Sequence, residues 1–249
     1  MTIYYLNCFT CNARIPRHWQ SGQLCLLIES NDGLVLVDTG IGTRDYFHEP
    51  AILWTFKLAT IVPLNPDQAA MRQIVKLGYQ PEDVRHIVLT HMHFDHAGGL
   101  PDFPWAKVHV HRREYEAIKS GRFRRWTDGG YNRRVLDHGP DFVFYEETGG
   151  QWYDFDAIPL PFEPEMYLLP LFGHSSGHCG VAIKDGDGWL LHVGDAASFA
   201  PDVPEWLVRF VLGPHQPRLR AFDHAHPEVR MTTGHMDLKF FTALPASYR

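Results

Sequence analysis

Short apolar runs separated by turn-forming residues predict the strands of the chain. Residues 24–28 and 34–37 are apolar and flank Ser30-Asn31-Asp32-Gly33, in which the Asp-Gly pair is typical of a hairpin turn. Continuous apolar runs of this length are typical of strands that are buried on both faces. Later runs of the same kind predict strands at residues 86–90, 107–111, 166–170, 181–184, 189–193 and 229–233.

Helical spacing occurs between these runs. Asn65-Pro66 supplies an N-cap followed by proline at the first helical position, and apolar residues then recur at helical spacing until Gly78. The same spacing predicts helices at residues 114–120 and 204–212. No linker, charge block or repeat interrupts this alternation. We therefore expect a single α/β domain over residues 1–249, with sheets inside and helices outside.

One apolar segment, residues 51–64, shows no clean helical stripe. It contains Lys57 and Pro63 and is shorter than the roughly 20 residues that a membrane span needs, so we expect no transmembrane helix. Two interpretations of the segment are open. It is buried as core or as a homodimer contact, because most apolar stretches bury themselves. Alternatively it is a lid, in which Trp54 and Phe56 line an apolar substrate channel.

The composition is that of an ordinary globular protein. The 249 residues are 45% hydrophobic and 13% aromatic, which is enough for a sizeable core and disfavours disorder. With 23 Lys and Arg against 29 Asp and Glu, the net charge is −6, so nucleic acid is not an expected partner. The first residues show no secretory signal, which favours a cytoplasmic location. The four cysteines are too few for a disulfide scaffold and are expected to be reduced.

The segment His91-Met92-His93-Phe94-Asp95-His96 indicates metal binding. A chance match to this histidine and aspartate spacing anywhere in the chain has a probability of about one in two hundred. Alternate side chains at a strand end point the same way, so His91 and His93 can converge on one metal ion. The following turn directs Asp95 and His96 toward a second ion. Imidazole and carboxylate ligands suit Zn²⁺, with Mn, Fe or Co as alternatives.

Three further candidate ligands follow predicted strands. His174 lies in Gly173-His174-Ser175-Ser176-Gly177-His178, while Asp195 and His235 each come directly after an apolar run and a glycine. Together with the first segment, this series of motifs resembles the metallo-β-lactamase superfamily. The resemblance extends from Asp38-Thr39-Gly40 to His235. It implies a four-layer αβ/βα sandwich and a site for two divalent transition-metal ions, with Zn²⁺ as the expected identity.

The resemblance also implies a role for each candidate residue. It assigns the ligands of the two ions as His91, His93 and His174 for one, Asp95, His96 and His235 for the other, and Asp195 between them. Asp38 would steady the ligand loop, and His178 would support the ligands without binding metal itself. Asp95 would in addition act as a catalytic residue that passes a proton to the leaving group.

Two metal ions can activate water and polarise a carbonyl or phosphoryl oxygen, so hydrolysis is the expected chemistry. Residues 77–99 and Asp195-Ala196 resemble the N-acyl homoserine lactonases, which implies a small lactone or ester as substrate. Those enzymes have a tyrosine three residues after the bridging aspartate. This chain has Ser198 there, followed by Phe199, and we expect both in the substrate pocket. A glyoxalase II-like thioesterase, although only 14 residues follow His235, a phosphodiesterase and a ligand-binding regulator remain alternatives.

Overall fold

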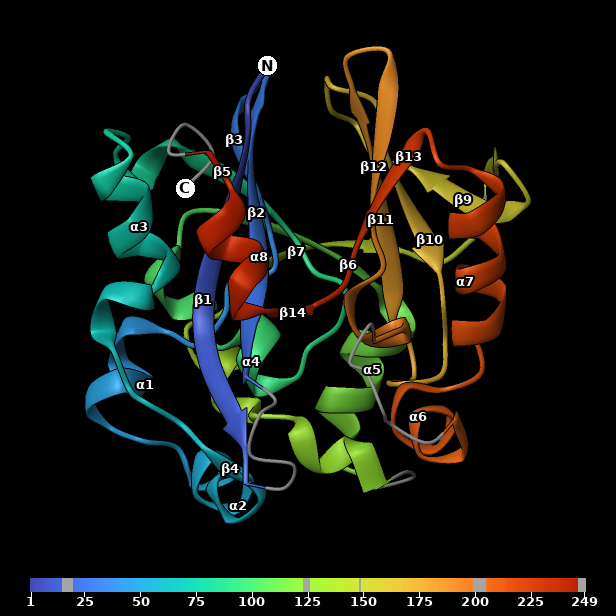
Figure 1. Ribbon diagram of the computed structural model, residues 1–249. Helices are drawn as coiled ribbons and strands as arrows, with labels where there is room; N and C mark the ends of the chain where they lie inside the picture. Colours follow the sequence, from blue (N-terminus) through green and yellow to red (C-terminus); the bar gives the residue numbers. More distant parts are fainter. Residues whose placement is uncertain (15–19, 123–125, 148, 199–204, 246–249) are drawn as a thin grey trace.

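Two β-sheets lie face to face at the centre of the molecule, with helices on their outer sides (Figure 1). The computed structural model describes residues 1–14, 20–122, 126–147, 149–198 and 205–245. Helices α3 (Ala70–Lys76) and α5 (Arg112–Ser120) bury side chains against the first sheet, and α7 (Gln216–Ala225) does so against the second. This arrangement confirms the predicted four-layer αβ/βα sandwich.

In each sheet the spatial order of the strands differs from their order in the sequence. In spatial order, the first sheet contains β4 (Thr60–Ile61), β1 (Ile3–Ala13), β2 (Gln20–Ser30), β3 (Gly33–Val37), β5 (Val84–Val88), β6 (Lys107–His111) and β7 (Asp141–Tyr145), and β14 (His235–Asp237) pairs with β2. The second contains β13 (Val229–Thr232), β12 (Gly188–His192), β11 (Cys179–Asp185), β10 (Met166–Pro170), β9 (Phe155–Pro159) and β8 (Gly150–Trp152). The other helices are α1 (Thr43–Phe47), α2 (Ala51–Ala59), α4 (Phe94–Ala97), α6 (Glu205–Leu212) and α8 (Leu238–Ala243).

Strand β3 shows how the core is divided between the layers. Leu34 and Leu36 pack in the outer cluster that includes Ile74 of α3, whereas Val35 and Val37 pack in the cluster between the sheets. Successive side chains of a strand point to opposite faces, so β3 is buried on both sides. Its continuous apolar run therefore has a direct structural cause.

The predicted strands and helices are present as β2, β3, β5, β6, β10, β11, β12, β13, α3, α5 and α6. Strand β2 is longer than expected, and the helix expected from Pro66 begins with a 3-10 turn, Pro66–Gln68, before α3. The hydrophobic pattern did not predict β1, whose apolar residues are interrupted by Asn7, Thr10 and Asn12. It also did not predict α7, in which polar residues surround the buried Leu219 and Phe222. Strand β1 is buried on both faces, and its polar residues break the apolar run. Helix α7 packs one narrow side against the core, which leaves a weak period in the sequence.

The apolar segment at residues 51–64 begins as a helix, α2, which its spacing did not predict. Leu53 is fully buried, whereas Trp54 and Leu58 are 67% and 80% exposed. Because both sides of the helix carry apolar residues, no amphipathic stripe marks it in the sequence. Across the parts of the chain that the structure describes, α2 included, no helix is long and apolar enough to cross a membrane.

A chain of hydrogen bonds joins β3's hairpin turn to β7 through two buried histidines, His86 and His109. The Asp32 carboxylate accepts from His86 Nε2 at 3.1 Å, so His86 Nδ1 accepts from His109 Nε2, also at 3.1 Å. The hydroxyl of Tyr145 then donates to His109 Nδ1 at 2.8 Å. Phe162 packs against both imidazoles. These directions are the ones that two neutral imidazoles take.

Replacing His109 with glutamine should reduce the loss of stability in acid. Burial, followed by the charges of His86 and Lys107, lowers the pKa of His109 to about 3, against about 6.5 in an unfolded chain. A depressed pKa gives stability that is complete above about pH 6.5 and is lost as the pH falls. Between pH 6.5 and pH 5, the free energy of unfolding of the wild type should fall by about 2 kcal/mol because of His109. The free energy of unfolding of His109→Gln should not show this decrease.

Chemical denaturation of the metal-loaded protein at several pH values measures this difference. His224→Gln, which replaces an exposed histidine of α7, is the matched control. Parallel pH curves for wild type and His109→Gln would show that the buried imidazole pair does not limit acid stability.

Candidate metal centre

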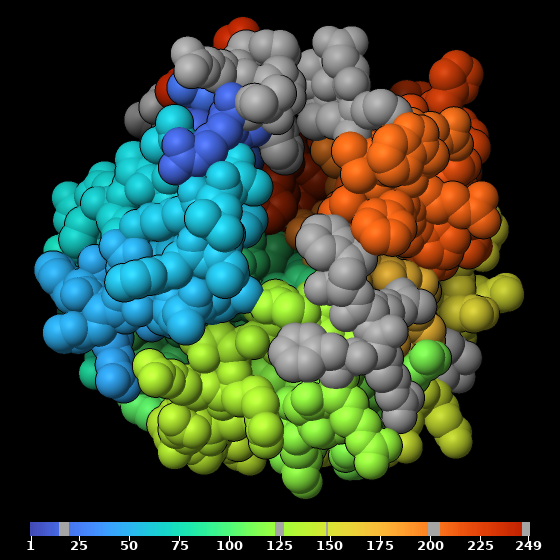
Figure 2. Space-filling model, turned by 90° about the horizontal axis from the view of Figure 1, so that it is seen from below, coloured from blue at the N-terminus to red at the C-terminus, as the bar shows by residue number. Residues whose placement is uncertain are grey.

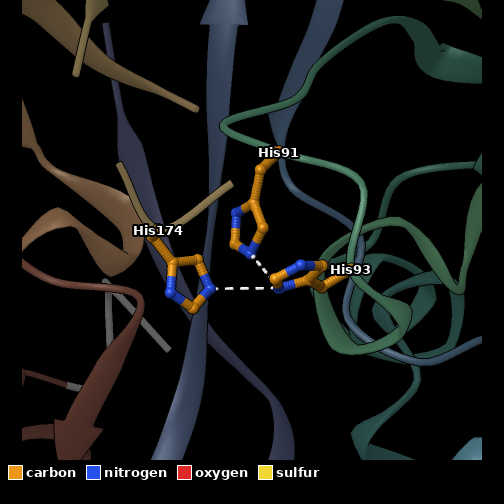
Figure 3. A group of neighbouring side chains, drawn as sticks. All are labelled: His91, His93 and His174. Carbon is orange, nitrogen blue, oxygen red and sulfur yellow. Dashed lines mark hydrogen bonds between the residues drawn. The ribbon is translucent and has the colours of Figure 1, made fainter. Parts of the chain in front are cut away.

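Three buried histidine rings converge on one point (Figure 3). His91 and His93 come from the loop after β5, and His174 comes from the loop after β10. His91 Nε2 lies 3.1 Å from His93 Nδ1, and His174 Nε2 lies 3.0 Å from the same atom. Nitrogen ligands at 2.0–2.1 Å from a tetrahedral zinc ion lie about 3.3 Å from one another. The observed spacing therefore fits a single metal ion.

Hydrogen-bond directions leave lone pairs where these rings meet. The hydroxyl of Thr90 donates to Asp38 Oδ2 at 2.7 Å, so its oxygen accepts from His91 Nδ1 at 3.1 Å. His174 Nδ1 donates to a backbone carbonyl oxygen of α6 at 2.9 Å. A neutral imidazole carries one proton, so His91 Nε2 and His174 Nε2 both direct lone pairs at His93. Such an arrangement fits a bound cation.

The protonation of these rings agrees with metal binding. Burial lowers the pKa of His91, His93 and His174 below the usual range, and neighbouring imidazoles lower the pKa of the first two further. The neutral form is the one that binds metal. Among the described residues, His93 Nε2 and His96 Nε2 are buried without a hydrogen-bond partner.

A second group of candidate ligands lies beside the first. His235 Nε2 lies 3.3 Å from Asp95 Oδ2, and the ligand atoms of Asp95, His96 and His235 all lie within 4.8 Å of one another. Asp95 and His96 lie in α4, and His235 begins β14. Carboxylate and imidazole side chains from distant parts of the sequence thus meet at one place.

Asp195 lies between the two groups. Its Oδ1 is 3.5 Å from His96 Nε2, and its Oδ2 is 3.5 Å from His174 Nε2 and 3.6 Å from His235 Nε2. Burial alone would raise the pKa of Asp195, but the surrounding histidines outweigh burial and hold it well below the usual range. The side chain is therefore an ionised carboxylate within reach of both groups, which suits a shared ligand.

Asp38 contacts both groups from behind. Its carboxylate accepts from the backbone N–H of Thr90 at 2.9 Å and from His96 Nδ1 at 2.8 Å, in addition to the Thr90 hydroxyl. Burial would raise the pKa of Asp38, but His96 and His192 lower it to about 2. The residue has a φ of +57°, which is unusual for aspartate and adds strain at this position.

Glu114 is a buried residue of the site that the sequence did not reveal. Its Oε1 accepts from the backbone N–H of Met92 at 2.9 Å, and its Oε2 accepts from Ser175 Oγ at 2.7 Å and from the N–H of Gly177 at 2.8 Å. One carboxylate thus joins the loop of His91 and His93 to the loop of His174. Its position four residues before the buried Ile118 of α5 is the signal that could have identified it.

His178 lies beside the candidate ligands, but its Nε2 accepts a hydrogen bond and is not directed at a metal ion. The backbone N–H of Asp195 donates to His178 Nε2 at 3.0 Å. Burial and the nearby His174 lower the pKa of His178 to about 3, so this nitrogen stays an acceptor. The hydrogen bond holds the backbone that carries Asp195.

The residues expected in the substrate pocket, Trp54, Phe56, Ser198 and Phe199, do not share one environment. The ring of Phe56 lies 5.4 Å from that of Phe94, inside the ligand motif, whereas Trp54 on the same helix is exposed. The backbone N–H of Ser198 donates to Gln216 Oε1 at 2.8 Å. Phe199 lies outside the described residues.

The face of the molecule seen in Figure 2 is hollowed between the light-blue segment that includes α2 and the orange segment that includes α6. Green and dark-red atoms are visible at the floor of this hollow, in the colours of the segments after β5 and after β13. Candidate ligands come from both of these segments. Helices α2 and α6 therefore lie on opposite sides of this hollow.

The geometry agrees with a comparison to known proteins. Residues 19–233 match the family described as the metallo-beta-lactamase superfamily. The chain belongs to the metallo-β-lactamase superfamily. This confirms the resemblance that the motifs carried.

Relatives within the superfamily include hydrolases. The chain is 41% identical over 199 residues to a Mycobacterium tuberculosis protein named a probable metallo-hydrolase, covering 78% of this chain and 62% of that protein's length. It is 38% identical over 186 residues to an N-acyl homoserine lactonase of Bacillus thuringiensis, covering 72% and 67%. A solved N-acyl homoserine lactone hydrolase has the same fold, with a TM-score of 0.70 at 23% identity and 98% coverage of both chains.

Adding a methyl group at Gly234 should weaken metal binding in this superfamily member. A Cβ at Gly234 would overlap Asp195 Oδ1 and lie 2.9 Å from His96 Cε1. The carboxylate would have to move, and displaced ligand support typically costs about 10 to 100-fold in metal affinity. Competition with a chelator should show this loss for Gly234→Ala. Gly150→Ala is the control, because a Cβ there meets nothing within 4 Å; equal affinities in both variants would contradict the shared position of Asp195.

Glu114→Gln should disturb the first group of histidines. Glutamine keeps the shape but offers an NH₂ group in place of one carboxylate oxygen, so one loop loses its acceptor. The visible spectrum of the Co²⁺-substituted protein should change, and the affinity for the first ion should fall by about tenfold or more. Glu116→Gln, an exposed residue of the same helix, is the control. An unchanged Co²⁺ spectrum in Glu114→Gln would mean that the carboxylate supports folding alone.

Proposed function

We propose that the protein is a metal-dependent hydrolase that opens a lactone or cleaves an ester, with an N-acyl homoserine lactone as the leading candidate substrate. The observation that carries the proposal is the pair of ligand groups around Asp195, whose ligand atoms lie within 4.8 Å of one another in each group. The lactonase relatives support the substrate class. A dizinc lactonase that shares the fold, with a TM-score of 0.58, supports two zinc ions.

Seven residues would hold the two ions: His91, His93 and His174 for one, Asp95, His96 and His235 for the other, and Asp195 for both. Bound divalent ions supply Lewis acidity, which activates water and polarises the substrate carbonyl. In the overall reaction the carbonyl carbon gains the hydroxyl of water, the C–O bond breaks, and the leaving oxygen gains the remaining proton.

The residues of this chain orient the reaction. Asp95 is buried and ionised at neutral pH, because His235 and His96 outweigh burial and lower its pKa. We assign to Asp95 the transfer of the proton to the leaving oxygen. Phe56 lies against Phe94 on the ligand loop, so we assign Phe56 and the exposed Trp54 to the wall of the substrate site on the α2 side. The backbone of Ser198 is tied to Gln216, and its side chain replaces the tyrosine of the lactonases.

Removing the shared carboxylate should lower both the metal content and the turnover. Metal-replete wild type should contain about two transition-metal ions per chain and hydrolyse N-acyl homoserine lactones. Asp195→Asn should lose close to one ion per chain and about a thousandfold in kcat/KM, since the variant lacks the charge between the two groups. Elemental analysis and a panel of lactones, thioesters and phosphodiesters measure the two quantities.

Asp156→Asn removes an exposed carboxylate of β9 and should match the wild type in both measurements. Preferred turnover of a thioester or a phosphodiester would replace the lactone as substrate. Full metal loading and full activity in Asp195→Asn would refute the assigned centre.

A further inference from the structure

A cavity of about 410 Å³ lies beside His174. Its wall includes Gly173, which directly precedes His174, and Arg209 and Phe210 of α6. The same helix accepts the hydrogen bond from His174 Nδ1 through the carbonyl oxygen of Val211. The cavity and the first group of metal ligands therefore share one piece of backbone, and a molecule in the cavity would lie next to the candidate metal centre.

The wall of this cavity combines apolar and cationic chemistry. Phe172 and Phe210 supply aromatic rings, and Thr127 supplies a hydroxyl. Arg209 supplies a guanidinium. The cavity volume is within the range of pockets that bind small molecules, about 300–1,000 Å³. A ligand with an apolar body and a polar end would find a partner for each part.

The charge at this wall is unpaired. Arg72, Arg218 and Arg230 form ion pairs with aspartates, but the exposed side chain of Arg209 has no ionic or hydrogen-bond partner within the described ranges. Arg113 lies with its guanidinium carbon 4.2 Å from the centre of the Phe172 ring, and it too lacks an acidic partner among those residues. Arg209 at the cavity wall and Arg113 over the Phe172 ring are therefore two cations without acidic partners among the described residues, in a protein whose net charge is −6. Guanidinium groups bind planar carboxylates in a bidentate manner.

We propose that this cavity binds a carboxylate at the far end of the substrate's acyl group, with Arg209 as the residue that selects it. The inference rests on the proposed hydrolase function and narrows its substrate class to lactones or esters that carry a carboxylate remote from the reacting carbonyl. The apolar part of the acyl group lies along Phe172 and Phe210, and the carboxylate meets Arg209. A planar group with a single charge matches one guanidinium and one hydroxyl.

Matched substrates test this selection. Homoserine lactones with a hexanoyl or a 5-carboxypentanoyl group have acyl chains of equal length that end in a methyl or a carboxylate. The wild type should favour the carboxylate by about tenfold in kcat/KM, since a charge-assisted bond replaces a neutral contact. Arg209→Gln should reduce that ratio to about one, and Arg209→Lys should retain part of it, since lysine cannot bind in a bidentate manner.

Arg220→Gln is the control, because it removes the same charge from an exposed position of α7 that does not line the cavity. Its substrate ratio should equal that of the wild type. A wild type without the preference, or a preference that persists in Arg209→Gln, would overturn the proposal.

A binding measurement separates this proposal from the hydrolase function. Calorimetry on the metal-loaded protein should show tighter binding of adipic acid monoamide than of hexanamide, and Arg209→Gln should lose that difference. If no ester or lactone is turned over but the binding difference is present, the hydrolase proposal fails and the carboxylate site stands. If lactones are hydrolysed and the two amides bind alike, the carboxylate site fails and the hydrolase proposal stands.

Discussion

The buried carboxylate of Asp38 sets the proton positions on which the candidate metal centre depends. It accepts the Thr90 hydroxyl, so that oxygen must accept from His91 Nδ1, and His91 Nε2 is left with a lone pair. It also accepts from His96 Nδ1, which directs His96 Nε2 toward Asp195. One carboxylate thus orients a candidate ligand in each group. The positive φ of Asp38 is the strain that this position requires.

This constraint ties the site to the packing of the two sheets. His91 and His96 follow strands of the first sheet, whereas His174 and Asp195 follow strands of the second. Glu114 holds their loops together by accepting hydrogen bonds from both. Metal ions held at this junction would bind the folded state alone and stabilise it by mass action. Metal binding and the packing of the two sheets are therefore thermodynamically coupled.

The sequence predicted what short-range patterns encode. Strands such as β3 are buried on both faces, so their apolar runs are continuous, and the ligand motif follows one such strand directly. Contacts between residues that are far apart in the sequence produce no such pattern in it. Glu114 meets Gly177 across 63 positions, and α2 is apolar on both its buried and exposed sides. The family resemblance supplied the pairing of ligands, which spacing alone could not, because Asp195 and His235 meet only in the folded chain.

The side chains beside the entrance of the site are less constrained by packing than the candidate ligands. The candidate ligands lie at strand ends within sheets whose hydrogen bonds and two-sided burial fix the backbone. The helices beside the entrance, α2 and α6, bury only Leu53 and Val208 among their described side chains. Side chains on their exposed faces can change without disturbing the core, which is why loops and flanking helices commonly carry specificity. The overall charge of −6 does not show such local differences, since Arg209 places a positive charge at the cavity wall.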